Sequence, residues 1–412
     1  MSRRVVVTGV GLVTPLGNDV ETTWQALRAG KSGVGPITAF DTTGYETRFA
    51  AQVRDFDVSQ YLDRKTARHT DPFAQYAVAA TQQALTDAEF RIDDANADDV
   101  GVIIGSGIGG LHACSDQFQV LFERGPGRIS PFFIAEFMAN SAAGLVSILT
   151  GARGVTFATV SACATGANAI GEAAEIIKRG DAIAMLAGGA EACVTPITMA
   201  AFAATRATSR RNDDPARASR PFDATRDGFV VGEGAGMLLL EEETHAKSRG
   251  AHIYAELIGY GCTADAHHMV EPAPGGVGLA RAIRRALAKG EIAAEQVDYI
   301  NAHGTGTIYN DRSETQAIKS VFGAHAYHLM VSSTKSMIGH TFGAAGAIEA
   351  IVTALSLDRG MVTPTINLTT PDPECDLDYT PLTAREAPIT VALSNSMGFG
   401  GHNTVLALRR GA

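Results

Sequence analysis

An internal duplication constrains the fold of this 412-residue chain more than any other feature. Four segments of the first half return in the same order in the second half: 4–9 as 255–259, 100–110 as 297–307, 155–180 as 328–360, and 182–192 as 389–401. Each half is predicted to run strand, loop, strand, loop, long helix, strand. The chain therefore consists of two similar α/β units.

The composition of the two long helices predicts how the units are layered. The helices expected over 164–178 and 344–357 are rich in Ala and Gly and have little polar face. Such helices must be buried between layers, where small side chains permit close contact. We therefore expect an α/β fold of five layers, α/β/α/β/α, with two sheets and halves 1–250 and 251–412. The segments 63–87, 115–140 and 196–222 are interpreted as insertions, which often carry specificity.

Charge and cysteine content exclude several classes of protein. The net charge of -10 argues against a general nucleic-acid binder. Five scattered cysteines without a CxxC pair indicate a reducing compartment rather than a disulfide scaffold. No uninterrupted apolar run reaches membrane-spanning length, since 182–204 is broken by Glu191 and Pro196. We predict a cytoplasmic protein without membrane insertion.

Cys163 is the candidate nucleophile. It follows the apolar segment VTFATV and precedes the first small-residue helix, so it lies at a strand-turn-helix elbow that would expose a thiol. The partial positive charge of a helix N-terminus is expected to lower the pKa of this thiol. The other four cysteines are interpreted as ordinary buried residues.

His303 in AHGTGT and His340 in KSMIGHTFGAAGA are the candidate partners of this thiol. His303 is expected at a strand end, and His340 just before the helix that mirrors the one after Cys163. If the halves are related by a pseudo-twofold axis, Cys163 and His340 stand at equivalent helix starts and face each other. Metal-ligand spacing is absent around both histidines, so no zinc is predicted. The pattern indicates acyl transfer through a covalent thioester.

The motifs RVVVTGVGLVTPLG, SRPFDATRDGFVVGEGAG, AHGTGTIYNDRSET, STKSMIGHTFGAAGA and NSMGFGGHN extend across essentially the whole chain. Together they resemble the β-ketoacyl-[acyl-carrier-protein] synthases, specifically the type II elongating enzymes of bacterial fatty-acid synthesis. The resemblance implies the thiolase fold and a homodimer. It also implies decarboxylative condensation of acyl-carrier protein with malonyl-carrier protein, without any cofactor beyond the phosphopantetheine arm of the carrier protein.

The resemblance also implies roles for individual residues. Cys163 would accept the acyl chain, and His303 and His340 would assist decarboxylation and stabilise the enolate. The backbone N–H groups of Cys163 and Phe399 would form the oxyanion hole. Charged residues would support the histidines, namely Lys335, Asp311, Glu314 and Glu349. The phosphopantetheine arm or the acyl chain would be contacted by Thr305, Thr307, Ile108, Phe133 and Phe399. The acidic carrier protein would dock on Lys65, Arg68 and Arg206.

Several alternatives are weighed against this reading. GSGIGG (105–110) satisfies a dinucleotide-binding pattern, but no acidic residue ends a second strand about twenty residues later. A thiolase proper would carry a second cysteine in the C-terminal glycine loop, and a chain-length factor would lack Cys163. A catalytic polyketide ketosynthase would keep all three residues and stays open. No metal is assigned, although the resemblance leaves room for a structural cation near Asn301, Glu349, Ser394 and Asn395.

Overall fold

The computed structural model describes residues 3–411. Ten strands join in one sheet in the order β10-β9-β13-β14-β8-β1-β7-β6-β4-β5. The first half contributes β1 (Val5–Val13), β4 (Val100–Gly105), β5 (Thr156–Phe157), β6 (Ala184–Glu191) and β7 (Gly234–Glu242). The second contributes β8 (Ala255–Ala264), β9 (Tyr299–Asn301), β10 (Met330–Ser332), β13 (Val391–Gly398) and β14 (His402–Arg410).

The predicted duplication is visible in the strand order. Each half contributes five strands to this sheet, and the order β5-β4-β6-β7-β1 repeats as β10-β9-β13-β14-β8. The first three strands of each set are parallel, and the last two pair antiparallel. The expectation of two separate sheets was wrong in one respect, because β1 and β8 are themselves paired through Val6–Glu256 and Val7–Ala255. This short antiparallel contact makes the two five-stranded halves one ladder.

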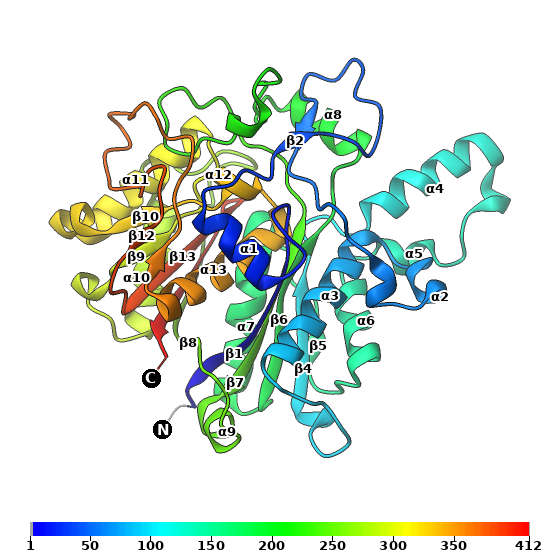
Figure 1. Ribbon diagram of the computed structural model, residues 1–412, viewed down its shortest axis with the longest axis horizontal. Coiled ribbons are helices and arrows are strands. Elements are labelled where there is room, and N and C mark those ends of the chain that lie inside the picture. Colours follow the sequence, from blue (N-terminus) through cyan, green and yellow to red (C-terminus); the bar gives the residue numbers. More distant parts are fainter. Residues whose placement is uncertain (1–2, 412) are drawn as a thin grey trace.

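The five predicted layers are present. The central layer consists of α7 (Thr165–Arg179) and α13 (Ala345–Arg359), which pack against each other and against strands of both halves. One outer layer contains α3 (Pro72–Asp87) and α6 (Ser141–Thr150), and the other contains α10 (Val277–Lys289) and α11 (Ile308–Phe322). Figure 1 shows α7 and α13 in the middle of the molecule, with the outer helices on either side.

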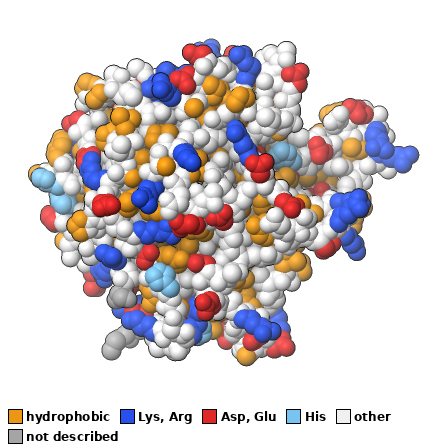
Figure 2. Space-filling view, in the orientation of Figure 1, with side chains coloured by type: hydrophobic (Ala, Val, Ile, Leu, Met, Phe, Trp, Pro, Cys, Tyr) orange, Lys and Arg blue, Asp and Glu red, His pale blue; other side chains and the backbone are white. Residues whose placement is uncertain are grey.

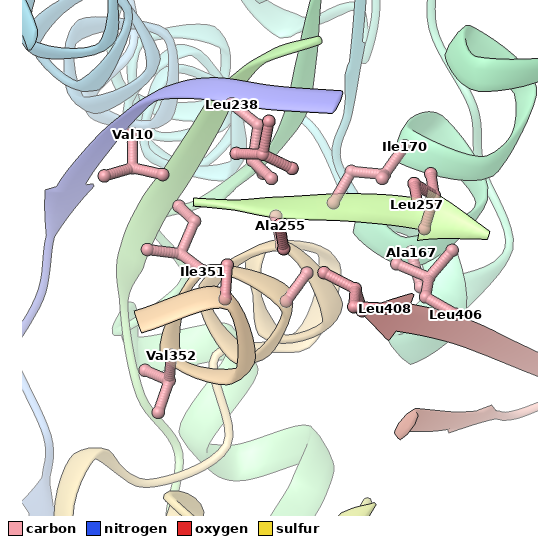
Figure 3. Packing of buried hydrophobic residues seen from close by; sticks show 14 of the residues in the cluster. Val10, Ala167, Ile170, Leu238, Ala255, Leu257, Ile351, Val352, Leu406 and Leu408 are labelled. Atoms are coloured by element: carbon pink, nitrogen blue, oxygen red, sulfur yellow. The ribbon is translucent and has the colours of Figure 1, made fainter. Parts of the chain in front are cut away.

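Apolar side chains from both halves meet around the central helices. Figure 3 shows Ile351 of α13 and Ile170 of α7 among side chains of the strands on either side. The strand residues labelled there come from β1, β7, β8 and β14, namely Val10, Leu238, Ala255, Leu257, Leu406 and Leu408. Separate apolar clusters lie under α3 and α6 and under α10 and α11. The two halves therefore share the central core, and each has an outer core of its own.

The interpretation of 63–87 as an insertion was wrong. Its helix α3 begins at an Asp71 cap and packs on β1 and β7, as α10 packs on β8 and β14 in the second half. Helix α3 therefore belongs to the repeated scaffold. The sequence did not reveal that α3 corresponds to α10, because the two helices pack on equivalent strands but have no sequence motif in common. The segments 115–140 and 196–222 stay outside the scaffold, and Figure 1 shows α4 and α5 projecting from the body.

The remaining helices and short strands connect these layers. The helices are α1 (Val20–Arg28), α2 (Arg64–Ala67), α4 (Leu111–Arg124), α5 (Phe133–Phe137), α8 (Pro196–Ala204), α9 (Glu243–Ser248) and α12 (Lys335–Ile338). Two small ribbons pair β2 (Gly35–Pro36) with β3 (Phe49–Ala50), and β11 (Met361–Val362) with β12 (Arg385–Glu386). Within residues 3–411, no helix combines the length and the apolar character needed to cross a membrane.

Replacing Gly166 by Ala is expected to destabilise the fold, because α7 packs directly against the backbone of α13 there. A Cβ atom on Gly166 would lie 2.8 Å from the Ala347 nitrogen and 2.9 Å from the Gly343 oxygen. The strain should lower the free energy of unfolding by about 1–3 kcal/mol, more than the helix propensity of Ala (about 1 kcal/mol) returns. Denaturant titration measures this loss.

Gly144→Ala in α6 is the matched control, since a Cβ at Gly144 would meet nothing within 4 Å. This variant should unfold at the native denaturant concentration or slightly above it. Equal midpoints for Gly166→Ala and Gly144→Ala would show that the close helix contact is not needed for stability.

Candidate active site

Cys163 lies at an elbow between a strand and a buried helix, as predicted. A short 3-10 turn, Ala162–Ala164, connects the end of the β5 segment to α7. Ala162 has a φ of +50°, which is a strained conformation for a residue with a side chain. The Ser161 N–H donates to Oγ1 of Thr165 at 2.8 Å and fixes the turn to the first helical residue. The elbow therefore holds the thiol at the N-terminal end of α7.

A second elbow of the same shape lies in the other half. The 3-10 turn Phe342–Ala344 leads into α13, and Phe342 has a φ of +45°. The two elbows contact each other. Gly343, and not His340, occupies the position that corresponds to Cys163, so the expected equivalence of Cys163 and His340 was wrong. His340 precedes the second elbow and reaches the site from its own loop.

Burial controls the ionisation of the Cys163 thiol. Loss of solvent raises its pKa to about 12, although the Lys335 ammonium and the N–H groups of Phe399 and Cys163 act in the opposite direction. The expectation of a lowered pKa was therefore wrong. Cys163 is only 6% exposed, and the effect of this burial on the pKa is larger than the opposite effect of the helix N-terminus. The resting site holds a neutral thiol.

Two backbone N–H groups converge on the thiol. One belongs to Cys163 and the other to Phe399, which follows β13. Gly398 permits this approach, because a Cβ atom there would lie only 2.7 Å from the Ser161 oxygen. This is the pair of donors predicted for the oxyanion hole. The Phe399 side chain is 37% exposed, as a residue at the mouth of the site would be.

His303 and His340 lie side by side, with ring centroids 5.4 Å apart and planes at 85°. Burial, and then the positive charge of Lys335, hold the pKa of both imidazoles well below the ordinary value. The Phe342 N–H donates to Nδ1 of His340 at 3.3 Å, so the proton of this neutral ring is on Nε2. The site thus offers at least one uncharged imidazole N–H donor.

The predicted charged support is built around a buried ion pair. Nζ of Lys335 bonds to Oε1 of Glu349, and both side chains are about 1% exposed. Burial raises the pKa of Glu349 to about 7, although Lys335 opposes the change. Since the ammonium lowers the imidazole pKa values, this pair acts on the histidines through its field.

Glu314 and Asp311 support the site by holding backbone, not imidazole. The Glu314 carboxylate accepts the N–H groups of His303 and Gly304, each at 2.8 Å. Asp311 accepts the Gly306 N–H at 3.2 Å and forms a buried ion pair with Arg226 at 3.3 Å. Both carboxylates lie on α11, so this helix fixes the loop that carries His303.

Several buried oxygen atoms lie on Glu349 and on β9 and β13 without a hydrogen-bond partner among residues 3–411. These include Oδ1 of Asn301, Oε2 of Glu349, Oγ of Ser394 and Oδ1 of Asn395. An oxygen-only donor set suits hard cations and not zinc. No group of three or more His, Cys, Asp or Glu side chains in the described part of the chain is placed to hold a metal ion.

An apolar cluster surrounds the thiol. Ile108, Phe202, Phe229 and Phe342 belong to the same cluster as Cys163. The Phe342 ring stacks on Phe202 at 4.9 Å and on His340 at 4.6 Å, so one aromatic group connects the cluster to the imidazoles. A wall of this kind suits an acyl chain.

The other predicted substrate and docking residues are dispersed. Phe133 lies outside the cluster, on α5, where it stacks on Phe137. Thr305 and Thr307 lie in the His303 loop with their hydroxyl oxygens 3.0 Å apart. The exposed Lys65 and Arg68 share the α2 region, whereas the exposed Arg206 follows α8 elsewhere on the chain surface (Figure 1). Figure 2 shows positive and negative side chains intermixed on the face in view.

Two buried residues of the site region were missed by the sequence analysis. Arg226 pairs with Asp311 and Asp372, and its side chain is 1% exposed. Glu191 ends β6 and bonds to the loops on both sides of the cluster. A carboxylate directly after the apolar run AMLAGGA was the available signal, because a charged residue inside a buried strand requires dedicated partners.

Models of two protein families match the chain. The "Beta-ketoacyl synthase, N-terminal domain" covers residues 2–246, and the "Beta-ketoacyl synthase, C-terminal domain" covers residues 254–369. The chain belongs to the β-ketoacyl synthase family. It is thus a condensing acyltransferase with the thiolase-like fold.

Curated relatives resemble this β-ketoacyl synthase over their full length. A 3-oxoacyl-[acyl-carrier-protein] synthase 2 from Synechocystis is 53% identical over 99% of this chain and 98% of its own. Proteins of the same name from Staphylococcus aureus and Coxiella burnetii are 50% and 52% identical, each over 99% of both chains.

Solved structures share the fold of this β-ketoacyl synthase. One from Burkholderia phymatum, described as a β-ketoacyl synthase, has a TM-score of 0.92 and 40% identity over all of both chains. A type II polyketide ketosynthase, solved with its acyl-carrier protein and a bound hexaketide, has a TM-score of 0.93 and 38% identity over all of both chains.

Alkylation of Cys163 should be slow at neutral pH and accelerate with alkali. Because the folded thiol has a pKa of about 12, its thiolate fraction should rise about tenfold per pH unit between pH 7 and pH 10. Peptide mass spectrometry after brief iodoacetamide treatment measures the rate at this residue. Cys262, which is exposed, provides the internal comparison. A Cys163 rate that is already constant above pH 7 would contradict the buried neutral thiol.

Proposed function

We propose that this protein elongates fatty acids by condensing acyl-carrier protein with malonyl-carrier protein to give 3-oxoacyl-carrier protein and carbon dioxide. The observation that carries the proposal is the combination of one neutral thiol at an elbow with two uncharged imidazoles under an apolar wall. The 50–53% identity to proteins named 3-oxoacyl-[acyl-carrier-protein] synthase 2 supports the pathway.

The first half-reaction moves the acyl group to Cys163. The Cys163 sulfur attacks the thioester carbonyl, and the thiol proton leaves with the pantetheine sulfur. The negative charge that develops on the carbonyl oxygen is held by the N–H groups of Cys163 and Phe399, whose geometry supports this role. Ile108 and Phe342 then line the path of the acyl chain.

The second half-reaction forms the carbon–carbon bond. The bond to the malonyl carboxylate breaks, carbon dioxide leaves, and the electron pair passes to the thioester oxygen as an enolate. Neutral His303 and His340 donate hydrogen bonds to that oxygen, which stabilises charge without a strong base. The enolate carbon attacks the Cys163 thioester and expels the thiolate, which takes up one proton from solvent.

The substrates supply the remaining chemistry. We infer that no cofactor is needed beyond the phosphopantetheine arm of the carrier protein, which Thr305 and Thr307 contact. The exposed cations Lys65, Arg68 and Arg206 suit the rim of an acidic carrier protein by electrostatic steering. The cytoplasm is the compartment proposed for this reaction, in agreement with five cysteines that form no disulfide.

A second copy of this chain is the proposed partner of β5. This strand is the edge of the first half-sheet, and both of its residues are exposed. Large apolar side chains are exposed on α6, which contacts β5, and on the loop after β5, including Ile148 at 79% and Val160 at 61%. The exposed apolar surface continues onto α5, which contacts α6, and onto α4, which contacts α5, with Ile134 at 61% and Phe122 at 82%. An open strand edge flanked by apolar surface is unfavourable in water, so we infer a homodimer that covers it. Phe133 on α5 would then lie toward the partner.

A polyketide ketosynthase is the second candidate. The solved type II polyketide ketosynthase is similar over its full length, but at 38% it is less identical than the fatty-acid synthases at 50–53%. That ketosynthase was solved with a bound hexaketide. Product analysis after many turnovers therefore separates the two activities.

The two half-reactions should separate in Cys163→Gln and the histidine variants. Cys163→Gln should abolish condensation yet decarboxylate malonyl-carrier protein, because the neutral amide resembles the acylated thiol and both histidines remain. His303→Ala and His340→Ala should each slow decarboxylation, since an enolate donor is lost. A loss of about 3 kcal/mol in barrier stabilisation corresponds to roughly a hundredfold in rate. Carbon dioxide release measures this rate.

The acyl-enzyme provides the control for this assignment. Incubation with acyl-carrier proteins of graded length should leave an acyl mass on Cys163, and none should appear in Cys163→Ala. Acylation of another cysteine in that variant would remove Cys163 from the mechanism. Native decarboxylation rates in both histidine variants would remove the imidazoles from it.

Val160→Asp should convert the dimer to a monomer, because a carboxylate would be buried without a partner beside the paired β5 strands. Val277→Asp is the matched control, because Val277 is 48% exposed at the start of α10 on the other half. Light scattering after size exclusion measures the mass of each variant. A native protein of monomer mass, or a Val160→Asp dimer as stable as the control, would contradict the proposed interface.

A further inference from the structure

Glu191 is a completely buried carboxylate that the proposed mechanism does not use. It ends β6, and each of its oxygens has a definite partner. Oε1 accepts the Ser106 hydroxyl at 2.8 Å, and Oε2 accepts the N–H groups of Gly107 at 2.8 Å and Gly343 at 2.9 Å. All three donors are neutral. Burying a carboxyl group among neutral donors is costly, so this arrangement needs a compensating reason.

The carboxylate connects two loops that frame the apolar cluster. Gly107 precedes Ile108 in the loop after β4, and Gly343 follows Phe342 in the second elbow. Ile108 and Phe342 both belong to the cluster around Cys163. The Glu191 carboxylate therefore links the loop that carries Ile108 to the elbow that carries Phe342.

The packing around this carboxylate leaves no free space. A Cβ atom on Gly107 would lie 2.9 Å from Oε2 of Glu191, and one on Gly343 would lie 2.7 Å from the same atom. Gly343 is the counterpart of Cys163 in the second elbow. At the first elbow the backbone N–H of Cys163 is directed toward its own thiol. At the second elbow the equivalent N–H, that of Gly343, donates to Glu191. Because Glu191 already accepts the Gly107 N–H, this N–H group of the GSGIGG segment is not free to bind a phosphate.

We propose that Glu191 is a positioning residue, whose reach sets the distance between the Ile108 and Phe342 walls and thereby the acyl chains that Cys163 accepts. The inference rests on the function proposed above. What the two loops need from Glu191 is an acceptor oxygen at a fixed distance from β6, and not its negative charge.

The ionisation of Glu191 agrees with a role that depends on the length of its side chain and not on its negative charge. Burial raises its pKa to about 7, although the Ser106 hydroxyl and the backbone N–H groups act in the opposite direction. Burial therefore favours the neutral form of this carboxyl group in the folded protein. One oxygen can still accept both backbone N–H groups when the other carries the proton.

Glu191→Gln and Glu191→Asp separate reach from charge. Gln keeps the length and one acceptor oxygen for the two N–H groups, whereas Asp keeps the charge and is one methylene shorter. Each variant is incubated with acyl-carrier proteins from acetyl to long-chain, and the rate of Cys163 acylation is followed by mass spectrometry. Gln should stay within about threefold of the native rates at every length. Asp should lose about tenfold or more with long chains and little with acetyl, since a misplacement of about 1 Å can cost up to a hundredfold.

Glu172→Asp is the matched control, because Glu172 lies on α7 and accepts a hydrogen bond from the Tyr260 hydroxyl at 3.0 Å, not from either of the two loops as far as residues 3–411 show. It should keep the native length profile. If Glu191→Asp does not fold, Ser106→Ala takes its place, because it deletes one of the three donors and should shift the profile in the same direction.

The outcomes separate this inference from the proposed function. A native length profile in folded Glu191→Asp, or a Glu191→Gln variant as impaired as Glu191→Asp, overturns the positioning role while the function stands. If the native protein leaves no acyl mass on Cys163, the proposed function fails, and the role of Glu191 fails with it.

Discussion

The close contact between α7 and α13 is the constraint on which the rest of this structure depends. The two helices touch where Gly166 and Gly346 face the backbone of the opposite helix, with positions for a Cβ atom only 2.7–2.8 Å from backbone nitrogens. Both helices begin at an elbow, so bringing the helices together brings the elbows together. The site is thus formed at the junction of two halves and belongs to neither alone. Small residues are needed there because any larger side chain would separate the loops that carry the chemistry.

Burial follows from this arrangement and determines the charge state of the site. A thiol and two imidazoles at the junction of the two half-sheets lose most of their solvent, and each group then favours its neutral form. The nearby Lys335 ammonium is itself paired with the Glu349 carboxylate. A neutral site suits decarboxylation, because negative charge develops during the reaction and meets fixed N–H donors that need no reorganisation.

The duplicated scaffold uses equivalent positions for different purposes. The strand ends at 106–107 and 303–304 correspond in the two halves, and a buried carboxylate binds each of them, Glu191 in one case and Glu314 in the other. At the elbows, one half has Cys163 and the other has Gly343. One half of the scaffold therefore carries the proposed nucleophile, and the other carries the loops with the two imidazoles.

The sequence by itself determined the repeated α/β units and the buried helices, and it singled out three residues that the structure brings together, because hydrophobic periodicity and rare polar residues next to glycine are local signals. It could not determine that α3 matches α10, since shared packing faces leave no shared motif. It also placed His340 at the wrong equivalent position and assigned the Cys163 thiol a pKa shift of the wrong sign. Only the tertiary structure decided these points, because the extent of burial and the partners of Glu191, Arg226 and Lys335 come from segments far apart in the chain.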